Sequence, residues 1–240
     1  MTEVLNETAC SIRLEPLGDD GIGIEFWLKK TDRTEYHQVK RQTSSSGYWT
    51  LSKLSGDRVL RNFYNKLRAN ESHVCFFVST QDVYLLSELV DRARRASSLE
   101  EFINESLKVE KYSEAFDDIC QIWNECSKRE AFDFLRRIFI KTSDEDTLKN
   151  NIVTNSIKPL IDGDPSTIAD VLAQFALDEI NKELSANEIW HHLKERGFKK
   201  CNWSKDPLVS AAAEECTDRS LPKFHEGTIS GKVIPSVPSR

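Results

Sequence analysis

Long apolar runs and paired cysteines are both missing from this sequence of 240 residues. No stretch approaches the roughly 18 consecutive apolar residues that a membrane-spanning helix needs. Residues 1–10 lack the basic segment and apolar run of a secretory signal. The six cysteines are scattered and form no Cys-x-x-Cys motif, which disfavours both a disulfide framework and a structural zinc site. We therefore expect a cytoplasmic protein with reduced thiols and no membrane partner.

The sequence also has no excess of basic residues. It contains 33 Lys and Arg and 39 Asp and Glu, which gives a net charge of −6. This excludes a strongly basic, histone-like protein. The charge is nevertheless uneven, since residues 21–70 contain 10 basic and 4 acidic residues. A basic segment on an acidic chain indicates a local anion-binding face, although a solvated surface without a ligand has the same composition.

Hydrophobic patterning predicts strands in the first part of the chain and helices in the rest. Strands are expected over 11–16, 21–28, 34–42 and 73–80, with a helix over 57–70 before the last of them. The short connection at 29–33 indicates an antiparallel hairpin. Helices are expected over 83–96, 99–107, 113–126, 129–140, 144–161 and 166–184, and a capping box at Ser185–Glu188 opens one more.

This order of elements predicts an α/β core with a mixed sheet flanked by helices, followed by an all-helical extension. We expect the core to span 1–97 and the extension 98–220. The segment 221–240 is rich in Ser, Pro and Gly and is typical of a linker-like tail. The end of the extension is compatible with a winged-helix-like unit, but its last helix mixes acidic with basic residues, so a packing or adaptor role is favoured.

The third strand carries the most specific chemical pattern. Alternation places Gln38 and Lys40 on one face of this strand and His37 on the other. The turn before the second strand holds Asp19 and Asp20, either of which can approach that face. Carboxylate and amide oxygens suit Mg²⁺, and a nearby lysine can stabilise charge on a phosphate. An exposed polar strand face would show the same spacing.

This part of the sequence resembles the PD-(D/E)XK nuclease superfamily, which has a restriction-endonuclease-like fold. The resemblance rests on Glu15-Pro-Leu-Gly-Asp-Asp20, the apolar strand after it, and His37-Gln-Val-Lys-Arg-Gln42. The resemblance is narrower to the double-stranded-DNA nuclease domain of bacterial anti-phage proteins, among them CBASS effectors and STAND-type NTPases. It implies an endodeoxyribonuclease that depends on Mg²⁺, with Mn²⁺ as an alternative.

The resemblance also implies roles for individual residues. The catalytic residues would be Asp20, Gln38 and Lys40, and the metal ligands Asp20, Gln38 and Glu15. Arg41, Lys53 and Lys29 would hold the DNA backbone. The glutamine at 38 departs from the usual carboxylate, which weakens the attraction for a metal ion.

The sequence contains no P-loop motif. This chain therefore does not supply its own P-loop. The resemblance implies that it is an effector module that works with a downstream or partner STAND-type NTPase or sensor, and we expect it to form a homo-oligomer when active. The alternative is a catalytically silent module that binds nucleic acid or a partner with the same fold.

Three further features have a structural and a functional interpretation. His37 is favoured as a packing residue over a catalytic base, because it faces away from Gln38 and Lys40. Trp49 is favoured as a core anchor over a base-stacking residue. Thr43 and Ser44–Ser46 could donate hydrogen bonds to phosphate or form a loop without a ligand.

Overall fold

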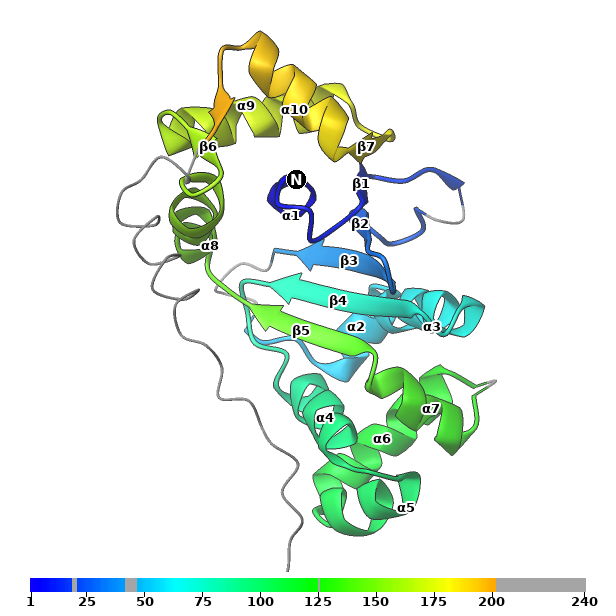
Figure 1. The fold of residues 1–240 in the computed structure, drawn as a ribbon. Helices are drawn as coiled ribbons and strands as arrows, with labels where there is room; N and C mark the ends of the chain where they lie inside the picture. The colour runs from blue at the N-terminus through cyan, green and yellow to red at the C-terminus, as the bar shows by residue number, and fades with distance from the viewer. Residues whose placement is uncertain (19–20, 42–46, 125, 202–240) are drawn as a thin grey trace, which may run out of the picture. The chain divides into compact units, whose positions relative to one another are not determined.

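The computed structural model describes residues 1–18, 21–41, 47–124 and 126–201, and Met1–Cys201 form one compact unit. Within the described residues, a mixed sheet has the strand order β5-β4-β3-β2-β1-β7 (Figure 1). Its strands are β1 (Ser11–Leu14), β2 (Phe26–Lys29), β3 (Thr34–Lys40), β4 (His73–Ser79), β5 (Ile138–Thr142) and β7 (Glu183–Ser185). The strands β3, β4 and β5 run parallel and the other pairs antiparallel. The predicted α/β class with a mixed sheet is confirmed.

Helices surround this sheet, as expected. They are α1 (Thr2–Leu5), α2 (Leu51–Gly56), α3 (Val59–Ala69), α4 (Tyr84–Arg95), α5 (Leu99–Glu101), η3 (Phe102–Ser106), α6 (Glu110–Ile122), α7 (Lys128–Leu135), α8 (Glu145–Asn151), η4 (Ile152–Ile157), α9 (Pro165–Asp178) and α10 (Ala186–Glu195). The predicted capping box opens α10, with Ser185 and Glu188 bonding reciprocally. None of the helices in the described part of the chain combines the length and apolar character that crossing a bilayer requires.

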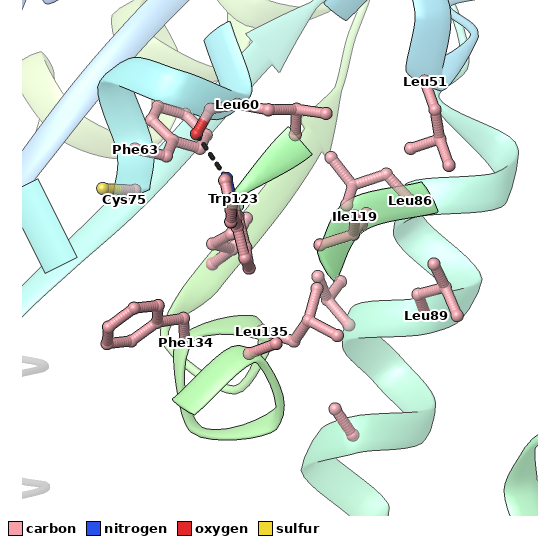
Figure 2. Close-up of a cluster of buried hydrophobic side chains, with 14 of the residues drawn as sticks. Leu51, Leu60, Phe63, Cys75, Leu86, Leu89, Ile119, Trp123, Phe134 and Leu135 are labelled. Carbon is pink, nitrogen blue, oxygen red and sulfur yellow. Dashed lines mark hydrogen bonds between the residues drawn. The ribbon is translucent and has the colours of Figure 1, made fainter. Parts of the chain in front are cut away.

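The first hydrophobic core lies on the face of β3 and β4 that carries Tyr36 and Phe77. Figure 1 shows α2 and α3 beside this face and α4, α6 and α7 further along the same side. Trp123, at the end of α6, is fully buried here. Its indole Nε1–H donates to the carbonyl oxygen of Leu60 at 2.7 Å (Figure 2). This bond joins α6 to the start of α3.

A second core joins α1, η4, α9 and α10 to strands β1, β2 and β7. Leu28, Ile168 and Leu193 are among its buried side chains. A small two-stranded sheet of β6 (Ile161–Asp162) and β8 (Lys199–Lys200) closes this part of the chain.

The region after residue 97 contributes strands as well as helices. Its strand β5 pairs with β4, and its strand β7 pairs with β1. The expectation of an all-helical extension is therefore wrong in this respect. A helix was predicted over 129–140, but α7 ends at Leu135. Ile138–Thr142, which has the apolar and β-branched residues of an edge strand, forms β5 instead. The predicted boundary at 97/98 lies inside the compact unit, and the predicted tail at 221–240 lies outside the described residues.

The opposite face of the sheet carries a row of stacked rings. His37 lies between Phe26, with ring centroids 4.3 Å apart, and Phe76, with centroids 4.5 Å apart. Phe76 stacks in turn on Phe139 of β5 at 4.8 Å. His37 is 4% exposed, and burial lowers its pKa most strongly, although the carboxylate of Glu35 opposes this. The interpretation of His37 as a packing residue is confirmed.

Candidate functional site

The candidate site lies where β3 and β4 end. Lys40 and Ser79 are register partners in this parallel pair, so they end neighbouring strands at the same edge of the sheet. The indole Nε1–H of Trp49 donates to Oγ of Ser79 at 2.7 Å, and the Trp49 N–H donates to the carbonyl oxygen of Asp82 at 2.8 Å. Trp49 is buried against Phe77. Its predicted role as a core anchor is confirmed, and it ties the loop before α2 to the end of β4.

Of the three predicted DNA-binding cations, Arg41 lies at this edge, and Lys53 lies in the helix that follows the Trp49 loop. Arg41 directly follows β3, and Lys53 lies in α2, with its Nζ 3.4 Å from the carbonyl oxygen of Tyr48. Lys29 lies elsewhere, because it is the register partner of Thr34 at the start of β3. The length of β3 therefore separates Lys29 from Lys40. The resemblance grouped Lys29 with Arg41 and Lys53, although the predicted 29–33 hairpin already puts Lys29 at the end of β3 that is far from Lys40.

An acidic residue that sequence reasoning missed lies beside Lys40. Glu25 accepts the N–H of Val39 through Oε2 at 2.8 Å, and its Oε1 lies 3.8 Å from Nζ of Lys40. The N–H of Glu15 donates to the carbonyl oxygen of Glu25 at 2.7 Å. Glu25 therefore contacts Lys40 through its side chain and Glu15 through its backbone, and β2 lies between the strands of Glu15 and Lys40. The hairpin register was the available signal, because counting back from the 29–33 connection places Glu25 opposite Gln38.

The environment of Glu25 favours its protonated form. Burial raises the pKa of Glu25 most strongly, and the nearby carboxylate of Glu15 raises it further. The N–H of Val39 and the ammonium of Lys40 act in the opposite direction but do not reverse the shift. Glu25 therefore holds a proton to a higher pH than an ordinary glutamate does.

Gln38 lies in the interior and not on an open surface. Its side chain is 1% exposed, and its Oε1 has no hydrogen-bond partner among the described residues. A buried amide oxygen without a partner is costly and rare. The sequence predicted the shared face of Gln38 and Lys40 correctly, but it did not predict this depth of burial.

Several predicted residues lie outside the described part of the chain. They are Asp19 and Asp20, together with the phosphate-binding candidates Thr43 and Ser44–Ser46.

The described donors do not form a dedicated metal site. No group of three His, Cys, Asp or Glu side chains within the described residues could hold a metal ion. Glu25 already accepts a backbone N–H, and burial favours its neutral form. The predicted Mg²⁺ ion and the predicted enzymatic activity stay predictions, and the described geometry supports no catalytic step through a metal.

Arg41, at the carboxyl edge of the parallel strands, is paired with an acidic residue of α8. Nε of Arg41 lies 2.9 Å from Oε1 of Glu145, the first residue of α8. Both side chains are largely exposed, so this ion pair is weak and accessible to solvent. It connects the end of β3 to a helix more than 100 positions later in the chain.

No protein-family model and no curated protein matches this chain. Among solved structures, one similar chain is the Acinetobacter baumannii Cap4 SAVED/CARF-domain containing receptor with the cyclic trinucleotide 3′3′3′-cAAA. The identity is 14% and the TM-score 0.47, and the match covers 81% of this chain and 42% of the receptor chain. The chain therefore spans less than half the length of that receptor.

The predicted PD-(D/E)XK nuclease family and nuclease function are corrected by this comparison. The structure found is described as a receptor with a bound cyclic trinucleotide, where a nuclease was expected. The predicted motif rested on the spacing of Gln38 and Lys40. The same spacing occurs on a strand that has no catalytic role, with a buried glutamine and a lysine at the end of the strand. The likeness is too low to carry the receptor's ligand over to this chain.

Proposed function

We propose that this chain is a nucleic-acid-binding module that holds the phosphate backbone of double-stranded DNA at the carboxyl edge of β3, β4 and β5. The observation that carries the proposal is the placement of Lys40 and Arg41 at this edge. Lys53 lies in the first turn of α2, just after the loop that Trp49 ties to Ser79. Ligands of open α/β sheets commonly bind outside the carboxyl ends of the parallel strands. Binding of this kind requires no hydrolysis.

The cations at this edge suit phosphate for a physical reason. Lysine and arginine side chains that neutralise backbone phosphates release condensed counterions, which makes binding favourable at low salt. Lys141 of β5 adds a fourth, exposed cation one step before the end of its strand. Glu25 lies near Lys40 with a raised pKa. Because a raised pKa favours the neutral, protonated form, Glu25 repels a phosphate less than an ordinary glutamate does.

The experiment is a binding measurement that separates binding from cleavage. Fluorescein-labelled duplex DNA is titrated with the whole chain in EDTA at several salt concentrations, and fluorescence anisotropy is recorded. We expect the affinity to fall with salt, and Lys40→Ala and Lys53→Ala each to reduce the salt slope by about one. Lys29→Ala is the matched control, because it removes the same charge at the other end of the sheet.

The outcome decides the proposal clearly. Equal losses in Lys29→Ala and Lys40→Ala would mean that net charge, and not this edge, controls the binding. Absence of binding at low salt would reject the proposal outright. A gel of the same DNA after incubation with Mg²⁺, with Lys40→Ala as its control, checks that the DNA stays intact while it is bound.

A further inference from the structure

An apolar groove lies beside the second core, between α8, η4 and α9 (Figure 1). It has a volume of about 390 Å³, and the start of α1 borders it. Two of its lining side chains, Ile157 and Leu172, are buried members of the second core. None of the cations of the proposed DNA-binding edge lines this groove. The groove is therefore a feature of the fold that the DNA-binding proposal does not use.

The wall that α9 contributes is made of small side chains. Ala169, Ala173 and Ala176 all line the groove. They lie four and three positions apart, so they share one face of this helix. An alanine side chain ends at Cβ, and this face therefore leaves space that larger apolar side chains would fill.

The opposite wall comes from α8 and η4. The N–H of Lys158 donates to the carbonyl oxygen of Val153 at 3.1 Å, a bond that spans five residues and defines a π-helical turn. Such turns are rare and occur frequently at functional sites. Leu148 is 44% and Ile152 is 38% exposed on this wall. Exposed apolar side chains that line a concave surface are typical of a ligand-binding groove.

The charged groups of the groove favour a ligand of one sign. Its two charged lining residues are Glu145 and Lys149. The carboxylate of Glu145 is paired with Arg41, with Oε1 2.9 Å from Nε. Nζ of Lys149 has no hydrogen-bond or ion-pair partner within the described part of the chain. An anionic ligand can therefore pair with Lys149 directly, whereas a cationic ligand would have to displace Arg41 from Glu145.

We propose that this groove binds an apolar carboxylate of the medium-chain fatty-acid type. The hydrocarbon chain lies along the alanine face of α9, and the carboxylate pairs with the ammonium of Lys149. The volume of the groove is near the lower end of the range for ligand pockets, which suits a single hydrocarbon chain. Burial of the CH₂ groups supplies most of the affinity, and the exposed ion pair selects the head group.

The test is isothermal titration calorimetry of the whole chain with octanoate, octylammonium and octanol at constant ionic strength. We expect octanoate to bind most tightly. Along the series butanoate, hexanoate, octanoate and decanoate, the affinity should rise by about twofold to fourfold per CH₂ group until the chain fills the groove. Equal affinity for the three head groups, or no binding of octanoate, would overturn the proposal.

A variant of the lysine tests the role of the head group. Lys149→Met keeps an apolar side chain of similar length and removes the charge. Because an exposed ion pair contributes at most about a factor of five, we expect octanoate to bind threefold to fivefold more weakly and octanol to bind unchanged. Lys194→Met removes an exposed lysine of α10 that does not line the groove, and it is the matched control. Equal losses in both variants would overturn the assignment to Lys149.

A second variant tests the groove itself. Ala173 is exposed, and in Ala173→Trp the indole should fill the groove and weaken octanoate at least tenfold. Gln174→Trp places the same side chain at the next exposed position of α9, which does not line the groove, and should bind as the wild type does. Unchanged binding in Ala173→Trp would overturn the proposal. Sedimentation velocity tests the other occupant, because a dimer that Ala173→Trp dissociates would assign the groove to a second copy of this chain and overturn the proposal too.

Discussion

Glu35 shows at the scale of one residue how a buried carboxylate is kept charged. Its side chain is 3% exposed, and its Oε1 lies 2.7 Å from Nη2 of Arg33 and 3.1 Å from Nζ of Lys30. Nε2 of His37 lies 3.4 Å from Oε2. Burial alone would raise the pKa of Glu35, but its interactions with His37, Arg33 and Lys30 outweigh burial and lower the pKa to about 2.

This shift predicts a pH dependence of stability. A carboxylate with a lowered folded-state pKa stabilises the fold above about pH 4.5 and loses this contribution as the pH falls towards 2. Glu35→Gln should lower the free energy of unfolding by about 2 kcal/mol at pH 7, with the difference from wild type shrinking between pH 4.5 and 2. Urea unfolding across this range measures it. A difference that stays constant with pH would contradict the assignment, and the exposed Glu105→Gln serves as control.

Comparing two buried tryptophans distinguishes the contribution of a hydrogen bond to stability from the contribution of burial. Trp123 donates to the Leu60 carbonyl oxygen (Figure 2), whereas Nε1 of buried Trp190 has no partner among the described residues. Trp123→Phe removes this hydrogen bond and part of the buried indole, so we expect a loss of about 3 kcal/mol in the free energy of unfolding. Trp190→Phe should cost about 1 kcal/mol less, because no bond is lost. Denaturant unfolding of both variants tests this, and equal losses would contradict it.

At the scale of an element, α10 depends on its first turn. Oγ of Ser185 lies 2.6 Å from the Glu188 carboxylate, which also accepts the Ser185 N–H at 2.8 Å. Ser185 also belongs to β7, which pairs with β1. The same residue therefore ends the sheet and begins the helix.

Removing this cap should destabilise the second core. Ser185→Ala removes a side-chain acceptor from the helix N-terminus, and we expect a loss of about 1 kcal/mol in the free energy of unfolding. Thermal unfolding followed by circular dichroism measures it. Ser166→Ala, at an exposed position in the first turn of α9, is the control and should change stability little. A similar effect of both variants would show that the capping box does not stabilise α10.

At the scale of the whole molecule, the pair between Arg41 and Glu145 connects the proposed DNA-binding edge to α8. Glu145→Gln should release Arg41 towards phosphate. Since exposed ion pairs contribute at most about 1 kcal/mol, we expect DNA affinity to rise about twofold to fivefold. Anisotropy titrations of the kind described for Lys40→Ala measure this. Glu105→Gln changes the net charge equally at a distant surface pair, and an equal gain there would assign the effect to net charge.

The sequence by itself determined the local elements. The strands β1, β3 and β4, the 29–33 hairpin and the capping box at Ser185–Glu188 were predicted because strand alternation, turn length and capping are set by neighbours along the chain. The strand predicted over 21–28 begins only at Phe26. The same local reasoning placed Gln38 and Lys40 on one strand face, placed His37 on the other, and identified Trp49 as a core anchor. It failed at 138–142, where apolar residues that continue a helical pattern form the edge strand β5.

Only the tertiary structure decided which distant residues meet. The tertiary structure added β5 and β7 to the sheet by pairing strands that lie far apart in the chain. It also brought Arg41 to Glu145 and formed the groove between α8, η4 and α9. These contacts depend on register and on the burial of whole helix faces, to which many weak interactions contribute together. No single motif encodes them, and this is why a short nuclease-like pattern around Gln38 and Lys40 led to the wrong family.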